Sequence, residues 1–291
     1  MDIIEKPSWL RKRLPTGDTY QQVEQNISEN RLHTICQEAC CPNQGECFSK
    51  GVATFLIMGN CCTRNCRFCA VSTGTPGPLD SEEPLRLASE IRDLGLSFAV
   101  ITSVTRDDLD DGGASHFART IQTIRETCPG VGIEILIPDF QGNPDALETV
   151  VAAAPEVLNH NVETIPRLYS VIRPQADYRQ SLRVLRKARD ACASLVTKSG
   201  IMVGLGETEA EVRQVMVDLH QAGCDILTIG QYLRPSVAHV PVAEYVHPDV
   251  FDRYGEMARE IGFKSVSSSP FVRSSYMAAV HYQYVKGQEK N

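Results

Sequence analysis

The chain has 291 residues, of which 42% are hydrophobic and 22% are charged, a composition that excludes a disordered or fibrous protein. Its net charge of −7 provides no basic surface for nucleic acid. No apolar run reaches the length of a membrane span and the first residues do not resemble a signal peptide, so we expect a cytoplasmic protein without a membrane or nucleic-acid partner.

The first part of the chain, residues 1–49, shows little hydrophobic periodicity and carries four cysteines. From residue 53 onward, short apolar runs alternate with charged, amphipathic stretches. The apolar runs predict strands at 53–59, 98–104, 132–138, 157–162, 195–203 and 226–233. The stretches between them predict helices at about 81–95, 113–127, 143–153, 178–193 and 208–222.

Strands that alternate with helices favour a parallel sheet with helical crossovers. We therefore predict an α/β fold in which residues 50–235 form a partial (β/α)6 TIM-type barrel. No Gly-x-Gly-x-x-Gly follows the first strand, which argues against a nucleotide-binding sheet. Residues 1–49 are an N-terminal extension. Residues 236–291 are a C-terminal extension with a helix near 248–261, a strand-like run at 263–266 and the motif Arg-Ser-Ser-Tyr.

In such barrels the chemistry lies at the carboxyl ends of the strands. The first predicted strand ends at Gly59, directly before a cysteine-rich loop. Thr105 follows the second strand, Asn161 and Glu163 follow the fourth, and Lys198 belongs to the fifth. Polar and titratable groups are therefore expected at one rim together with the thiols.

Eight of the eleven cysteines lie between residues 36 and 69. In a large chain without an export signal, clustered thiols favour metal ligands over disulfides. The three scattered ones, Cys128, Cys192 and Cys224, are expected to be small buried hydrophobes.

Cys62, Cys66 and Cys69, spaced C-x3-C-x2-C, form the loop triad. Three thiolates in a compact loop suit a [4Fe–4S] cluster with one iron left open for a ligand, because a closed zinc site needs four. Zinc binding or fortuitous clustering is the alternative, and Cys61 offers a substitute first ligand. Cys36, Cys41 and Cys47, spaced C-x4-C-x5-C, form the upstream triad; Cys40 allows other combinations, and a second structural metal site is the alternative there.

The loop triad directly after a first barrel strand, with Phe68 before its last cysteine, resembles the radical S-adenosylmethionine superfamily. Together with the upstream triad and Arg-Ser-Ser-Tyr near the end, the pattern resembles the lipoyl synthase family. Further similar stretches lie at 6–11, 38–43, 104–114, 160–164, 198–207 and 231–233.

The resemblance implies two [4Fe–4S] clusters and S-adenosylmethionine as cofactors. The loop triad would hold the cluster that binds S-adenosylmethionine. The upstream triad would hold an auxiliary cluster, completed by Ser275 with Ser274 as the alternative. The residues alone would instead indicate that this serine pair caps a helix.

The resemblance also implies the reaction: insertion of two sulfur atoms at carbons 6 and 8 of a protein-bound octanoyl-lysine, with sulfur drawn from the auxiliary cluster. The implied partners are octanoylated carrier proteins, namely the lipoyl domain of 2-oxoacid dehydrogenases or the glycine-cleavage carrier protein, and a reducing electron-transfer protein. Unactivated C–H bonds offer nothing to acid–base catalysis, which explains why the sequence shows no nucleophile–base pair.

The expected cofactor contacts each fit a rim salt bridge or a helix cap as well; they are Phe68, Thr105, Asn161, Glu163, Arg173 and Lys198. Two alternatives to the function remain. One is another radical enzyme with an auxiliary cluster, for sulfur insertion or methylthiolation. The other is a non-catalytic iron–sulfur or zinc protein, against which the polar rim argues.

Overall fold

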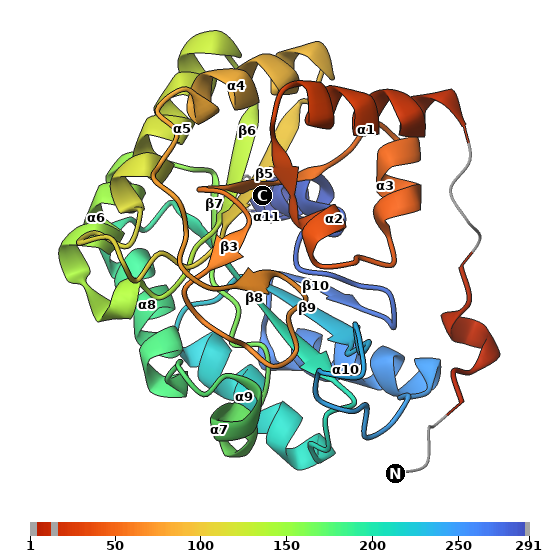
Figure 1. The fold of residues 1–291 in the computed structure, drawn as a ribbon. Helices are drawn as coiled ribbons and strands as arrows, with labels where there is room; N and C mark the ends of the chain where they lie inside the picture. Colours follow the sequence, from red (N-terminus) through yellow and green to blue (C-terminus); the bar gives the residue numbers. More distant parts are fainter. Residues whose placement is uncertain (1–4, 13–16, 289–291) are drawn as a thin grey trace.

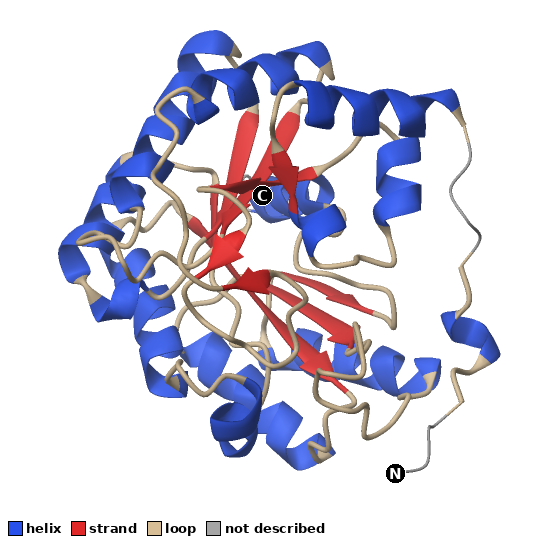
Figure 2. Ribbon diagram, viewed as in Figure 1, coloured by secondary structure: helices blue, strands red, loops and turns tan. Residues whose placement is uncertain are grey.

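The computed structural model describes residues 5–12 and 17–288. Its main sheet has eight strands, and helices surround it (Figures 1 and 2). In spatial order the strands are β1 (His33–Thr34), β2 (Thr54–Ile57), β5 (Phe98–Ser103), β6 (Gly132–Leu136), β7 (Val157–Asn159), β8 (Val196–Val203), β9 (Ile226–Gln231) and β10 (Ser265–Ser268). All neighbours from β2 to β10 are parallel, which confirms the predicted α/β fold with a parallel, barrel-like sheet.

The predicted helices between the strands are all present, and the apolar side of each packs on the sheet. The helix α9 shows why they begin where they do. The Thr208 side chain accepts a hydrogen bond from the Glu211 backbone, and the Glu211 carboxylate accepts one from the Thr208 backbone. The helices are α4 (Glu83–Asp93), α5 (Ala114–Thr127), α6 (Pro144–Ala152), α8 (Tyr178–Ala191), α9 (Glu209–Gln221) and α10 (Pro248–Ile261), with a short α7 (Tyr169–Ile172) before α8.

The N-terminal extension contains more regular structure than its sequence pattern indicates. A helix, α1 (Asp18–Glu29), packs on the core through Val23 and Ile27. Strand β1 pairs antiparallel with β2 and becomes an edge of the main sheet. Two short helices, α2 (Ile35–Glu38) and α3 (Gln44–Ser49), carry Cys36 and Cys47.

The C-terminal extension contains α10, as predicted, and α11 (Ala278–Gln288), whose bounds were not predicted. Val285 of α11 packs against the first residues of three strands, Val157, Val196 and Ile226. This helix therefore covers the amino ends of the strands. In the described part of the chain, no helix has both the length and the hydropathy that a bilayer span requires.

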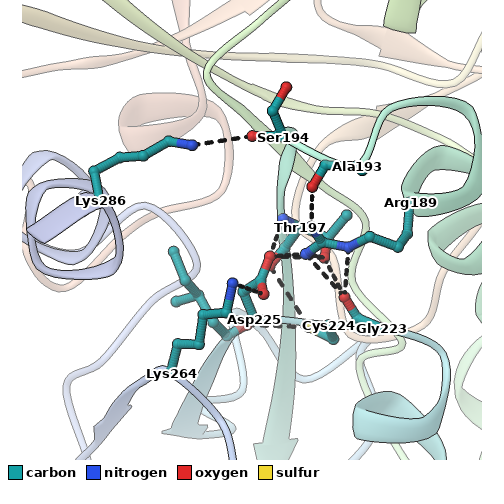
Figure 3. A network of polar contacts seen from close by, with 10 residues as sticks. Arg189, Ala193, Ser194, Thr197, Gly223, Cys224, Asp225, Lys264 and Lys286 are labelled. Atoms are coloured by element: carbon teal, nitrogen blue, oxygen red, sulfur yellow. Dashed lines mark hydrogen bonds and ion pairs between the residues drawn. The ribbon is translucent and has the colours of Figure 1, made fainter. Parts of the chain in front are cut away.

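A polar network joins the amino ends of β8, β9 and β10 (Figure 3). Its centre is Asp225, whose side chain is 7% exposed and lies directly before β9. The carboxylate accepts a hydrogen bond from the Thr197 backbone at 3.0 Å, and it pairs with Lys264 at 3.0 Å and with Arg189 from the end of α8. One carboxylate thus connects three strands and a helix on the side of the sheet opposite the carboxyl ends.

Removing this carboxylate takes away the anion that Arg189 and Lys264 face and the acceptor of the Thr197 N–H, and breaking a buried ion pair in this way costs several kcal/mol. We expect Asp225→Ala to lower the free energy of unfolding by about 3 kcal/mol in urea denaturation. Glu148→Ala, at an exposed position of α6, is the control and should change it by less than about 0.5 kcal/mol. Equal, small effects for both variants would show that the network does not stabilise the barrel.

Candidate functional site

A cavity of about 520 Å³ lies at the carboxyl ends of the strands. Five of the six triad cysteines belong to its wall, and Cys47 is the exception. Ser274 and Ser275 of the C-terminal extension also line it. Three segments that are far apart in the sequence therefore meet at one cavity.

The loop that carries the loop triad is fixed to the end of β5. Thr63 donates hydrogen bonds to the Thr105 carbonyl from its backbone and from its hydroxyl, both at 3.0 Å. The Cys62 sulfur accepts hydrogen bonds from the backbone N–H groups of Thr105 at 3.3 Å and Arg64 at 3.4 Å. These two donors hold the Cys62 sulfur in place at the cavity wall.

Arg64, inside the loop, is a residue that sequence reasoning missed. Its guanidinium forms a bidentate pair with Asp107, at 2.6 and 2.9 Å, and reaches Asp139 at 2.7 Å. Only 6% of its side chain is exposed. The signal available in the sequence was an arginine between two ligands, with acidic residues following two neighbouring strands. The pairing fixes the loop to the ends of β5 and β6.

The thiols of the loop triad are partly buried and influence one another. Burial raises the pKa of Cys69 to about 12, and the charges of Cys66 and Cys62 act in the same direction. Burial also raises the pKa of Cys66, against the opposing charge of Arg173. The thiolate is the form that binds metal, so iron binding at these residues must release protons.

The upstream triad behaves in the same way. Burial raises the pKa of Cys36 to about 12, and the nearby charges of Cys41 and Cys47 add to this effect. Burial raises the pKa of Cys47 to about 11, again with a contribution from Cys41. The three thiols are therefore neighbours, although Cys47 does not line the cavity. Across residues 5–12 and 17–288, no three Cys, His, Asp or Glu side chains form a group arranged to hold a single metal ion.

The wall near β7 supplies buried polar groups. Arg173 donates to the Asn161 carbonyl at 3.0 Å, while its Nε–H is buried without a hydrogen-bond partner. Burial raises the pKa of the Glu163 carboxyl, and the positive charge of Arg173 opposes this rise. The same carboxyl accepts a hydrogen bond from the Asn161 side chain at 3.1 Å. His160 Nδ1 bonds the Ile137 carbonyl at 2.9 Å, and burial lowers the pKa of His160 to about 4, so its Nε2 is an unused acceptor.

An unpaired buried polar atom costs free energy, and those on this wall belong to residues that line the cavity. A cationic N–H donor from Arg173 beside the acceptors of Glu163 and His160 fits a ligand that carries both a carboxylate and an amino group. S-adenosylmethionine carries both groups. The residues present therefore fit that cofactor at this wall, next to the loop triad.

The other expected contact residues occupy different places. Phe68 lines the cavity and packs with Ile172, Leu205 and Tyr232. Thr105 lines the cavity and contacts the loop through its backbone.

Lys198 requires a correction: it is fully buried and absent from the cavity wall, and its ammonium donates to both oxygens of Glu134, at 2.8 and 3.0 Å. A side chain in a strand points to either face of the sheet, and the sequence does not reveal which neighbour it meets. The structure therefore does not support a direct cofactor contact from Lys198.

Arg64 allows a prediction about the loop. Burial opposes ionisation of Asp139, but its hydrogen bond to Arg64 and the positive charge of Arg64 lower its pKa to about 2. The pKa is thus below the unfolded value of about 4, so this carboxylate stabilises the fold above about pH 4, and the stabilisation is lost as the pH falls toward 2.

We expect Arg64→Met to lower the free energy of unfolding by about 3 kcal/mol at pH 7 in the cluster-free chain, because two carboxylates lose their partner. The difference from wild type should shrink when urea unfolding is repeated at pH 3. Arg67→Met, at an exposed position in the same loop, is the control. A deficit that is the same at both pH values would contradict the assigned role of the Arg64–Asp139 pair.

Comparison with known proteins agrees with this geometry. The family model described as "Radical SAM superfamily" matches residues 56–219, and the model for the N-terminal domain of lipoyl synthase matches residues 3–41. The chain is 57% identical over 284 residues to the lipoyl synthase of Caldanaerobacter subterraneus subsp. tengcongensis, covering 98% of this chain and 99% of that protein. It is 55% identical to the lipoyl synthase of Nitrosococcus oceani, covering 94% and 85% of the two chains.

Solved structures show the same fold at low sequence identity. The hydrogenase maturase HydG has a TM-score of 0.57 at 15% identity, over 84% of this chain and 65% of that chain. Methylornithine synthase (PylB) has a TM-score of 0.52 at 14% identity, over 86% and 78%. The superfamily match implies a [4Fe–4S] cluster and S-adenosylmethionine. The chain belongs to the lipoyl synthase family of radical S-adenosylmethionine enzymes.

Proposed function

We propose that the enzyme inserts two sulfur atoms at carbons 6 and 8 of an octanoyl chain carried on a lysine of a carrier protein. The observation that carries this proposal is that cysteines of both triads and Ser275 line one cavity of about 520 Å³. A radical source and a sulfur source must both reach one acyl chain, and a shared cavity provides that access. When bound, the cluster on the loop triad supplies the electron that cleaves S-adenosylmethionine, and the cluster on the upstream triad supplies sulfur.

The loop triad would hold the first cluster through its three thiolates, and that cluster would bind S-adenosylmethionine. Asn161, Glu163 and Arg173 then orient the amino and carboxylate groups of that cofactor, and Phe68 and Thr105 complete its surroundings. The contribution of these residues is orientation and the exclusion of water, since the cofactor carries the chemistry. The unpaired Nε–H of Arg173 is the group in this chain that supports the assignment best.

The upstream triad holds the auxiliary cluster, and Ser275 is its fourth ligand. Two observations favour Ser275 over Ser274. Ser275 lines the cavity, and its hydroxyl makes no hydrogen bond within the described residues. The Ser274 hydroxyl already donates to Asn161 at 2.9 Å and accepts from Asn159 at 2.6 Å. To bind iron, the Ser274 hydroxyl would have to lose its proton, and the hydrogen bond that it donates to Asn161 would be broken.

The three parts of the chain have three roles in this proposal. Residues 1–49 bring the auxiliary ligands, residues 50–235 form the barrel with the radical chemistry, and residues 236–291 bring Ser275. The substrates are octanoylated carrier proteins, either a lipoyl domain of a 2-oxoacid dehydrogenase or the glycine-cleavage carrier protein. A reducing electron-transfer protein supplies the electron to the cluster on the loop triad. The reaction takes place in the cytoplasm.

The direct test is mass spectrometry of an octanoyl-lysine peptide after anaerobic incubation with reconstituted enzyme, S-adenosylmethionine and reductant, without free sulfide. We expect a product that has gained two sulfur atoms, as the dithiol under the reducing conditions, and that loses two hydrogens when the thiols are then oxidised to the disulfide. Enzyme with the upstream triad replaced by alanines should still release 5′-deoxyadenosine but add no sulfur. Sulfur transfer by that variant would contradict the assigned division of labour between the triads.

The serine ligand has its own test. An oxygen ligand is harder than a thiolate, and iron–sulfur clusters prefer soft thiolates, so the serine-bound iron is the easiest to release. We expect Ser275→Cys to retain the auxiliary iron, measured per chain, and to slow sulfur transfer at least tenfold. Normal turnover by this variant would show that release at Ser275 does not limit the reaction.

A further inference from the structure

A chain of buried polar contacts runs from the inside of the barrel to the C-terminal segment, which we define as residues 270–277. It begins at the fully buried Lys198–Glu134 ion pair. A carboxylate only accepts hydrogen bonds, so Glu134, at 3.2 Å, fixes which end of the Asn159 side chain carries the amide nitrogen. The same nitrogen donates to Ser274 at 2.6 Å.

The Glu163 side chain orients the residue on the other side of Ser274. The Asn161 side-chain nitrogen donates to Glu163 at 3.1 Å, which turns the Asn161 oxygen toward Ser274. The Ser274 hydroxyl donates to that oxygen at 2.9 Å. The Ser274 hydroxyl thus donates its one proton to Asn161 and accepts a hydrogen bond from Asn159. Both bonds join it to the end of β7.

Further contacts hold the C-terminal segment before the serines. Its backbone crosses β9 at Gly230, where an added Cβ atom would lie 2.1 Å from the Val272 carbonyl oxygen. Asn43, next to the upstream triad, donates to the Phe271 carbonyl at 2.7 Å. The Lys12 ammonium lies 4.6 Å from the centre of the Phe271 ring.

We propose that Ser274 is a positioning residue, which docks the C-terminal segment on the barrel so that Ser275 faces the cavity. The Lys198–Glu134 pair is the anchor of this docking, because it orients the Asn159 amide. This gives the buried Lys198 a role without any cofactor contact. The two adjacent serines thus have different roles: Ser274 hydrogen-bonds to the barrel, and the hydroxyl of Ser275 remains available to bind iron. The last step alone rests on the proposed ligand role of Ser275.

Hydrogen–deuterium exchange of the full-length, cluster-free chain tests the docking without reference to activity. The reporter is the peptide that covers residues 270–277, in which the Tyr276 amide donates to the Arg273 carbonyl at 2.9 Å. We expect Ser274→Ala to speed its exchange about tenfold or more, because two side-chain hydrogen bonds are lost. Ser275→Ala is the matched control and should leave exchange within about twofold of wild type.

Two more variants guard against a general loss of folding. Ser274→Thr keeps the hydroxyl and should restore slow exchange. In Gly230→Ala, the added methyl group would press on the Val272 carbonyl oxygen. This variant should speed exchange in residues 270–277 and leave exchange in a peptide from α4 unchanged. If Ser274→Ala also speeds exchange in α4, the variant has lost folding stability in general, and the other two variants test the proposal instead. Fast exchange of residues 270–277 in Ser274→Thr, or wild-type exchange there in Gly230→Ala, would overturn it.

Equal exchange in Ser274→Ala and Ser275→Ala, with α4 unchanged, would overturn it as well. The outcome of the Ser275→Cys experiment is independent of the exchange experiment, because it measures iron content and turnover in the loaded enzyme. Normal turnover there, together with fast exchange in Ser274→Ala, would leave the docking intact and show only that release of iron at Ser275 does not limit the reaction.

Discussion

The parallel direction of the strands is the constraint on which the rest of the structure depends. From β2 to β10 every strand ends at the same edge of the sheet, so whatever follows a strand is brought to that edge. The loop triad follows β2, Asn161 and Glu163 follow β7, and the C-terminal segment follows β10. The N-terminal extension is the exception, because β1 pairs antiparallel with β2; its Cys36 and Cys41 nevertheless line the same cavity.

Hydrophobic packing builds the barrel, but buried charges decide where the functional segments lie on it. Arg64 fixes the loop triad to Asp107 and Asp139, and the Lys198–Glu134 pair orients the amide that holds the C-terminal segment. An unpaired charge in these places would cost several kcal/mol, so each pair permits few arrangements of its loop. Rigid placement of this kind suits a reaction in which radical chemistry must be kept from water and aimed at one carbon atom.

The sequence alone predicted the alternating strands and helices well, because periods of two and of 3.6 residues are local properties. Thiol spacing also grouped the cysteines into two triads; all of them except Cys47 line the cavity, as does Cys40, and their roles as ligands stay a prediction. The helix α1 escaped notice because Val23 and Ile27 are its only buried residues, too few to give a clear period. The partner of Lys198 and the difference between Ser274 and Ser275 could not be predicted either. These depend on contacts between residues that are distant in the sequence, and two adjacent serines differ only in what they meet after folding.

The central claim is that the two triads hold two separate [4Fe–4S] clusters at one cavity. Its most direct test is the iron and acid-labile sulfide content per chain, measured for the wild type and for variants in which either triad is replaced by alanines. The account predicts about eight iron atoms in the wild type and about four in each variant, with 5′-deoxyadenosine formed only when the loop triad is intact. About four iron atoms in the wild type, zinc in place of iron, or loss of all iron when either triad is removed would contradict it.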